Sequence, residues 1–172
     1  MLSVYPLVSM EDVPALAVTA EDEKIVLYVV MRQRLKLVGG KIGAQVGHAV
    51  MFIVEEAARE HQPTPDELRL RRMRVPLTED ESKALEALEQ ADDRRRARQL
   101  LYQEWRAGEY GKIVLAASDE EFHLVKMRYG TSFLVIDNGH TQVEPNTETC
   151  VGIWPMRKKN RCDLLLRLKP LR

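Results

Sequence analysis

The chain has 172 residues, an apolar fraction of 45% and equal numbers of basic and acidic side chains, 26 of each. This length is sufficient for one globular domain with a buried core. The zero formal net charge excludes a strong overall attraction to nucleic acid, so an RNA ligand would need a local basic patch.

The sequence also limits the cellular environment. Its two cysteines, Cys150 and Cys162, are too few for a disulfide framework and lack partners at zinc-binding spacing, so we predict free thiols in a reducing cytoplasm. Glu11 and Asp12 interrupt the apolar residues of the N-terminus. No uncharged apolar run approaches about twenty residues, which argues against a signal peptide and a membrane span.

The first elements are an arm, a strand and a helix. Residues 1–22 contain prolines and scattered acids without a sustained period, and we predict an irregular arm. Residues 24–31, KIVLYVVM, are typical of a strand covered on both faces. After a diglycine turn, apolar residues at helical spacing predict a helix over roughly 41–60 that packs on the sheet. These residues are Ile42, Val46, Val50, Ile53, Val54 and Ala57.

Residues 61–98 are predicted to be a charged insertion in the domain. Three prolines indicate a connecting segment over 61–77. Thr78 and Glu81 then form a capping-box pattern, which begins a highly charged helix, continuous or broken, that runs to about Trp105.

Two arginine clusters lie in this insertion, at 69–74 and 94–98. They could contact RNA phosphates. Acidic residues interleave with them, so a solvated charged helix is the default interpretation.

The C-terminal part alternates strands with a helix. Ser118 and Glu121 repeat the capping-box pattern and begin a short helix that Gly130 ends. We predict strands at 112–116, 132–136 and 149–154, and an edge strand or a short helix at 164–168. The whole chain, 1–172, is therefore predicted to be one α/β domain, with a mixed central sheet of about four strands and helices on both faces.

Lys41 follows the diglycine turn at 39–40. A lysine at a helix start opposes the helix dipole, and a violated local rule often marks a site. With the backbone amides of the turn it could hold a phosphate or a developing oxyanion; a solvated lysine is the alternative. Leu35 and Ile42 stand where a P-loop needs a glycine and a hydroxyl residue, which disfavours a nucleoside-triphosphate site.

Two further polar residues follow in the same predicted helix. Gln45 and His48 lie four and seven residues after Lys41 and share a helix face with it, distinct from the apolar stripe. His48, like His140, could act as an acid–base group, although a histidine inside a helix is more often structural. Neither a nucleophile in a triad context nor a cluster with metal-ligand spacing is recognisable, so we predict no metal.

Asp137 ends a predicted strand and begins a polar loop. Its carboxylate could orient or deprotonate water. It could equally accept hydrogen bonds from the amides of an Asn138-Gly139 turn, and the residue alone favours this second role. Threonines at 141, 147 and 149 add hydroxyls that could bind a substrate or simply begin a strand.

Two separated segments together resemble a known family. Residues 40–49, GKIGAQVGHA, and residues 137–149, DNGHTQVEPNTET, are similar to the two signature segments of the archaeal/eukaryotic-type, or type 2, peptidyl-tRNA hydrolases. The resemblance covers roughly residues 24–60 and 99–172, and residues 61–98 look like an insertion relative to the compact family domain.

The resemblance implies an enzyme without cofactor or metal that hydrolyses the ester joining a peptide to the terminal ribose of tRNA, in the form of a cytoplasmic homodimer. In this hypothesis Asp137 orients or activates water, and Lys41 stabilises an oxyanion or a phosphate. The implied active centre is Lys41, Asp137, Thr141 and Thr149, where the threonines position water and ester. The implied supporting residues are Gly40, Gln45, His48, His140 and Gln142.

Several positions depart from the family pattern. Asn138 replaces a small residue, His140 replaces a permanent positive charge, and Asn146 replaces glycine. Gly43 and Gly47 replace small residues inside the helix, which lowers its helix propensity. Two other functions therefore remain alternatives: hydrolysis of another acyl or aminoacyl ester, and a non-catalytic RNA- or protein-binding module on the same scaffold.

Overall fold

The computed structural model describes residues 19–59, 62–73, 77–139 and 142–171. Most of the predicted N-terminal arm lies outside these residues. The prediction of irregular structure is wrong for its last part, because α1 (Ala20–Glu23) is a short helix. Thr19 caps this helix in a reciprocal arrangement with Asp22, which satisfies amides that a helix start otherwise leaves unpaired.

The central sheet has five strands in the order β3-β4-β1-β2-β5. β1 and β2 are parallel, and the other neighbouring pairs are antiparallel. The predicted mixed α/β sheet is therefore confirmed, with a short fifth strand added at one edge. The bounds are β1 Ile25–Arg32, β2 Lys112–Ala117, β3 Leu134–Asp137, β4 Thr147–Arg157 and β5 Lys169–Pro170.

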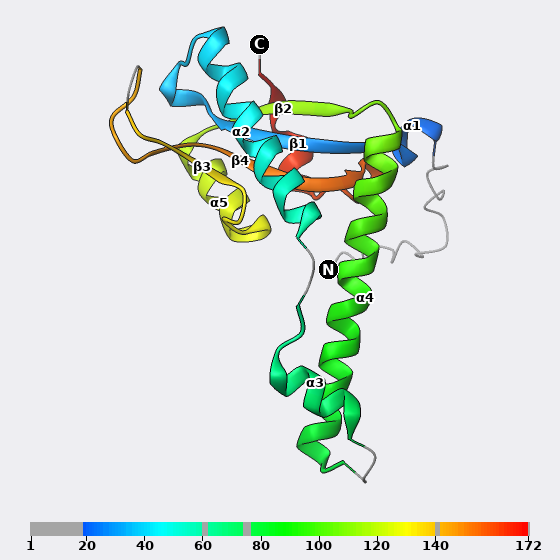
Figure 1. Cartoon of the computed structure of the whole chain (residues 1–172). Helices are drawn as coiled ribbons and strands as arrows, with labels where there is room; N and C mark the ends of the chain where they lie inside the picture. Colours follow the sequence, from blue (N-terminus) through cyan, green and yellow to red (C-terminus); the bar gives the residue numbers. More distant parts are fainter. Residues whose placement is uncertain (1–18, 60–61, 74–76, 140–141, 172) are drawn as a thin grey trace, which may run out of the picture.

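Helices cover both faces of the sheet (Figure 1), as predicted. Side chains that alternate along β1 point to opposite faces, and each set lies in a different apolar cluster. One face packs on α2 (Gly39–Ala58) and the end of α4 (Glu79–Ala107) through Leu27, Val29 and Met31. The other face packs on α5 (Asp119–Tyr129) and α6 (Asp163–Arg167) through Val26, Tyr28 and Val30.

The face of α2 that contacts the sheet includes most of the predicted apolar stripe, because Ile42, Val46, Val50, Ile53 and Ala57 pack in the apolar cluster on that side. Gln45, Ala49 and Ile53 are its buried residues. Val54, a member of the predicted apolar stripe, is 40% exposed. The buried face thus extends beyond the apolar stripe to Gln45, whose amide finds partners inside the protein that the sequence pattern does not reveal.

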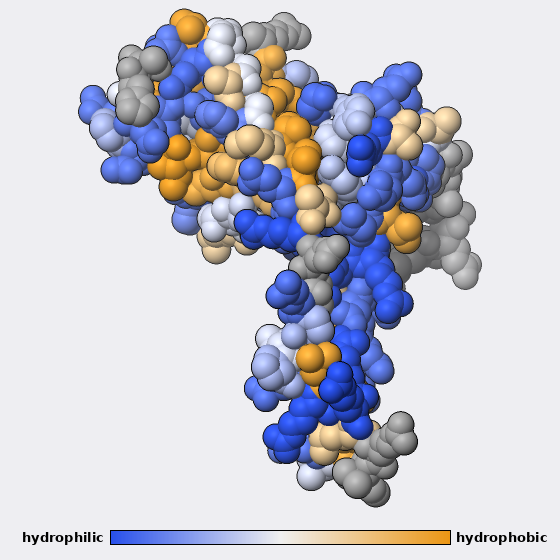
Figure 2. Space-filling view, viewed as in Figure 1, coloured by the Kyte–Doolittle hydropathy of each residue, from blue (hydrophilic) through white to orange (hydrophobic). Residues whose placement is uncertain are grey.

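Two helices project from the body as a hairpin (Figure 1). The segment expected to be a simple connection contains α3 (Pro65–Arg72), which Thr64 and Glu67 cap. α4 follows without a break, capped by Thr78 and Glu81 as predicted. Among the described residues from 62 to 101 none is buried, and Figure 2 shows a mostly hydrophilic surface over the hairpin. The hairpin therefore contributes little to the core.

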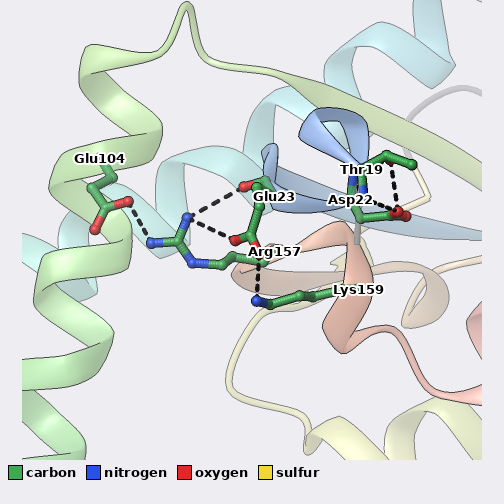
Figure 3. A network of polar contacts seen from close by, with 6 residues as sticks. All are labelled: Thr19, Asp22, Glu23, Glu104, Arg157 and Lys159. Carbon is green, nitrogen blue, oxygen red and sulfur yellow. Dashed lines mark hydrogen bonds and ion pairs between the residues drawn. The ribbon is translucent and has the colours of Figure 1, made fainter. Parts of the chain in front are cut away.

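The base of α4 is fixed to the body where β1 begins. Arg157 on β4 contacts Glu104 of α4 at 2.8 Å and Glu23 of α1 at 3.5 Å, as Figure 3 shows. Trp105, which is 1% exposed, donates from Nε1 to the Gly111 carbonyl oxygen at 2.8 Å. These contacts lie at the end of the sheet opposite to the polar loop after β3.

Three strands finish at that opposite end of the sheet, which is called the sheet edge below. β3 and β1 are each antiparallel to β4, so β3 runs in the same direction as β1 and β2. The carboxyl ends of all three strands, and the start of β4, therefore share one edge of the sheet. In open α/β sheets, ligands bind in the crevices outside such strand ends.

Candidate active site

A buried ion pair lies at this edge of the sheet. Asp137, the last residue of β3, contacts the ammonium group of Lys41 in the first turn of α2 through Oδ2. The side chains are 5% and 16% exposed, respectively. The structure thus brings together two residues that the sequence pattern singles out separately, 96 positions apart in the chain.

Gln45 links this pair to the interior. Its Nε2 donates to Asp137 Oδ2 at 2.5 Å, and its Oε1 accepts from the Thr149 hydroxyl at 2.9 Å. An ionised carboxylate only accepts hydrogen bonds, so the amide nitrogen of Gln45 must face Asp137 and its oxygen must face Thr149. The chain of contacts therefore fixes the orientation of each group from Thr149 to Lys41.

Thr149 occupies the innermost position of this chain of contacts. It is fully buried, at 0% exposure, and its hydroxyl also lies 3.1 Å from the carbonyl oxygen of Val135. One hydroxyl proton serves both acceptors. Because no surface of Thr149 reaches solvent in this conformation, its contact with the site passes through Gln45.

The loop after β3 holds the second oxygen of Asp137. Gly139 donates from its backbone nitrogen to Asp137 Oδ1 at 2.8 Å, which is the turn predicted as the alternative role of this aspartate. Gly139 has φ +79°, and a Cβ there would lie 2.4 Å from the Pro145 nitrogen, so the loop requires glycine. Asp137 therefore makes both the turn and the ion pair.

Asn146 adopts a conformation that glycine would also adopt. Its φ is 63°, in the left-handed region, where asparagine is among the most tolerated non-glycine residues. The departure from the family pattern at this position thus preserves the path of the backbone into β4.

The environment of Asp137 keeps it ionised. The hydrogen bond from Lys41 is the largest influence and lowers the pKa of the Asp137 carboxyl; burial opposes this, and the Gly139 and Gln45 donors add to the lowering. Three of about four acceptor positions of the carboxylate are used by these donors. At neutral pH the group is therefore a fixed negative charge and a weak base.

The first turn of α2 offers unpaired donors beside Lys41. Val38 is its N-cap and provides no side-chain cap. Among the described residues, the backbone amides of Gly39, Gly40 and Lys41 have no backbone acceptor outside the helix, as expected at a helix start. Gln142 ties the polar loop to this turn, because its Oε1 accepts from the Val38 backbone nitrogen at 3.3 Å. Gly40 is exposed at the same place.

The remaining predicted site residues are His48, His140 and Thr141. His48 is exposed on α2, and no hydrogen bond in the described part of the chain joins it to Asp137 or Gln45. His140 and Thr141 lie outside the described residues, so their roles stay predictions.

Sequence reasoning missed a basic group at the end of β1. Arg32 and Arg34 both contact Asp119, with distances of 2.7 and 3.0 Å from each Nε to a carboxylate oxygen. Asp119 is the first residue of α5. The signal in the sequence is the spacing of Arg32, Arg34 and Lys36 directly after the apolar run of β1.

Two further results concern cofactors and membranes. Within the described ranges, no three or more His, Cys, Asp and Glu side chains form a group that could hold a metal ion. None of the described helices is both long and apolar enough to cross a membrane.

The fold and this edge define an α/β protein with a polar site assembled at the carboxyl ends of its strands around a buried ammonium–carboxylate pair. The sequence matches the family described as Peptidyl-tRNA hydrolase PTH2 over residues 25–171, and the chain belongs to this family.

Curated archaeal proteins give the same result. A peptidyl-tRNA hydrolase of Methanopyrus kandleri is 31% identical over 136 residues, which covers 76% of this chain and 84% of that protein. A peptidyl-tRNA hydrolase of Haloquadratum walsbyi is 28% identical over 137 residues, covering 77% and 87%. One from Thermoplasma volcanium is 25% identical over 134 residues, covering 75% and 83%.

Proposed function

We propose that this protein hydrolyses the ester bond of peptidyl-tRNA, releasing the peptide and free tRNA. Membership of the family supports the substrate. The observation that carries the proposal is the buried contact between Lys41 and Asp137 at the carboxyl ends of the strands. This contact places a cation at a helix start, in a site that is largely shielded from solvent.

Lys41 is proposed to stabilise the negative charge that develops on the ester carbonyl oxygen. An ammonium group has three N–H donors, and Asp137 is the one acceptor that Lys41 contacts among the described residues. The two remaining donors, and the free amides of the first turn, are available for an oxyanion. Donors fixed in advance at the position of developing charge are often the largest source of catalysis.

Asp137 is proposed to hold Lys41 and to orient the attacking water rather than to act as a strong base. Its lowered pKa makes it a poor match for general base catalysis at neutral pH, which favours a pKa near the working pH. Its remaining acceptor position can still accept a hydrogen bond from water. This role needs geometry more than basicity.

Gln45 and Thr149 are proposed to be positioning residues. Gln45 is 2% exposed and Thr149 is 0% exposed, so neither offers a free surface to a substrate. Their hydrogen bonds instead fix the side chain of Asp137. This role for Thr149 differs from the one implied by the family resemblance, which is direct contact with water and ester.

The proposed reaction is balanced without a cofactor. The water oxygen adds to the ester carbonyl carbon, and the bond between that carbon and the ribose oxygen then breaks. One proton of the water is transferred to the ribose oxygen and the other is released to solvent, so that the peptide leaves with a carboxylate.

The test is the release of tRNA from a purified peptidyl-tRNA by the wild-type protein, compared with Lys41→Met and Asp137→Asn. We expect kcat/KM to fall by about 10²–10³-fold in Lys41→Met. Lys83→Met, an exposed lysine of the hairpin, is the matched control and should keep full activity. Absence of turnover by the wild type would refute the function, whereas equal turnover by all variants would refute the site.

Three finer properties are also proposed. The family resemblance supports a homodimer, a cytoplasmic location, and an origin of residues 61–98 as an addition to a compact domain. The lack of buried residues in the described part of the hairpin agrees with the last of these. Light scattering of the purified protein tests the dimer, and a deletion that joins residues 59 and 99 through a short linker tests whether the remaining domain folds.

A further inference from the structure

A cleft lies at the same end of the sheet as the proposed active site, between the carboxyl ends of β1 and β2. Its volume is about 790 Å³, and Met31 and Arg32 of β1 and Ala116 of β2 are among the residues that line it. β1 continues toward α2 on one face of the sheet, and β2 continues into α5 on the other. Helices that diverge in this way leave a crevice between parallel strands, which is where ligands of α/β proteins commonly bind.

The charge of this cleft is positive. It is lined by four basic side chains, Arg32, Lys36, Arg167 and Lys169, and by one acidic side chain, Glu121. Glu121 already accepts a hydrogen bond from the Ser118 backbone amide, at 2.8 Å, in the capping box of α5. Arg32 shares Asp119 with a second arginine, so one carboxylate faces two guanidinium groups.

Three of these cations have no counter-charge among the described residues. Lys36, Arg167 and Lys169 are exposed, and none forms an ion pair with a carboxylate in that part of the chain. Unpaired cations grouped in a concave surface attract polyanions, and the concave shape strengthens their field.

One residue that lines the cleft is next to an active-site residue in the sequence. Ile42, which follows Lys41 directly, lines it. On the other side of the 33–38 segment, a hollow is lined by Arg34 and Leu35 together with Gly139 and Gln142 of the polar loop. The segment between β1 and α2 therefore separates the cleft from the loop that holds Asp137.

We propose that this cleft binds the phosphate groups of the 3′-terminal nucleotides of the tRNA. The inference rests on the proposed function, because the ester to be cleaved is carried by the terminal ribose. The phosphates of the preceding nucleotides must then lie near Lys41, where the cleft provides cations and the start of α2 favours negative charge.

A rival basic surface on the hairpin is less suited to phosphate. It lies between α4 and the end of α2 and includes Arg59, Arg94, Arg95 and Arg98. Arg59 and Arg95 are paired with carboxylates. The surface also adjoins the C-terminal end of α2, whose dipole repels anions.

The experiment measures binding of a fluorescently labelled cytidine-cytidine-adenosine trinucleotide to the full protein at several salt concentrations. For Arg167→Gln/Lys169→Gln we expect a dissociation constant raised at least tenfold. The salt slope should be smaller by about 0.7 for each phosphate that the variant no longer neutralises. With peptidyl-tRNA, KM should rise while kcat stays close to the wild-type value, since neither residue belongs to the proposed catalytic group.

Two controls make the result specific. Lys83→Gln/Arg96→Gln removes the same charge from the hairpin and should bind the trinucleotide as the wild type does. Lys36→Asn lies outside β5 and α6 and suits the positive φ of 46° at that position, so it should weaken binding even if the double variant disturbs the fold.

The two proposals fail in different ways. Unchanged trinucleotide binding in both cleft variants, or equal weakening in the hairpin control, would overturn the cleft assignment. Binding that depends on the cleft in a protein without turnover would support the cleft and refute the proposed hydrolysis. Turnover with an unchanged KM in both cleft variants would leave the hydrolysis standing and refute the cleft.

Discussion

The sheet edge and the α3–α4 hairpin contain the same kinds of charged groups in opposite environments. Lys41 and Asp137 are 16% and 5% exposed, whereas the hairpin pair Lys83 and Glu79 is 67% and 84% exposed. Water screens an exposed pair, which contributes little to stability. A buried pair leaves an uncompensated charge when one member is removed. The comparison shows that location, not residue type, separates a structural and functional pair from a solvated one.

The largest expected effect on stability comes from removing the buried carboxylate. Asp137→Ala leaves the Lys41 ammonium and the Gln45 amide without their acceptor, and we expect a decrease of about 3 kcal/mol in the free energy of unfolding. Urea denaturation followed by circular dichroism measures it. Asp92→Ala in the hairpin, which removes the carboxylate partner of Arg71 and Arg95, is the matched variant and should change stability much less. Equal decreases would remove the distinction between the two regions.

The pH dependence of stability should sharpen the same distinction. The folded-state pKa of Asp137 is lowered, mainly by Lys41. Between this pKa and the unfolded-state value of about 3.9, the unfolded state therefore binds more protons than the folded state. The contribution of Asp137 is therefore complete above that value and is lost as pH falls through the folded-state pKa.

Urea denaturation at a series of acidic pH values measures this contribution. In Asp137→Asn the stability should fall less steeply below about pH 4 than in the wild type. Asp92 also has a lowered pKa, caused mainly by Arg71. It therefore adds a loss of stability at acidic pH, in the same direction, to both the wild type and the variant. A curve for Asp137→Asn that is parallel to the wild-type curve would contradict the assignment.

A smaller effect is expected at the innermost position. Thr149→Val removes the hydroxyl that donates to Gln45 at 2.9 Å, and an unsatisfied buried acceptor costs about 1–3 kcal/mol. We expect kcat to fall with little change in KM, because Thr149 acts through Gln45 on Asp137. Thr149→Ser, which keeps the hydroxyl, should restore kcat; no recovery would indicate a role in packing alone.

The smallest expected effect is a gain in stability. Gly43 and Gly47 lie on the exposed face of α2, and a Cβ at either position would meet no atom within 4 Å. Gly43→Ala and Gly47→Ala should each stabilise the protein by about 0.5–1 kcal/mol, because glycine loses more backbone freedom on folding. Thermal denaturation measures the gain, and unchanged turnover would show that these glycines do not serve the site.

The sequence is sufficient to predict much of the scaffold. Apolar runs place β1, β2, β3 and β4 to within a few residues, and the capping pairs at Thr78 and Ser118 begin their helices as expected. These signals are local, since burial on both faces or a capping hydrogen bond involves residues that are close in the chain. α3 is not predicted because the prolines around it indicate a connecting segment. One of them lies in the first turn of the helix, where proline is tolerated.

The sequence by itself therefore determined the strands, most helix starts, and Lys41 and Asp137 as candidates. Only the tertiary structure decided that these two side chains touch, that Asp137 also forms a turn, and that Gln45 is buried between Asp137 and Thr149. The hydrogen bonds of Gln45 reach 92 and 104 positions along the chain. A polar residue is buried when distant partners satisfy it, and periodicity within one helix contains no information about such partners.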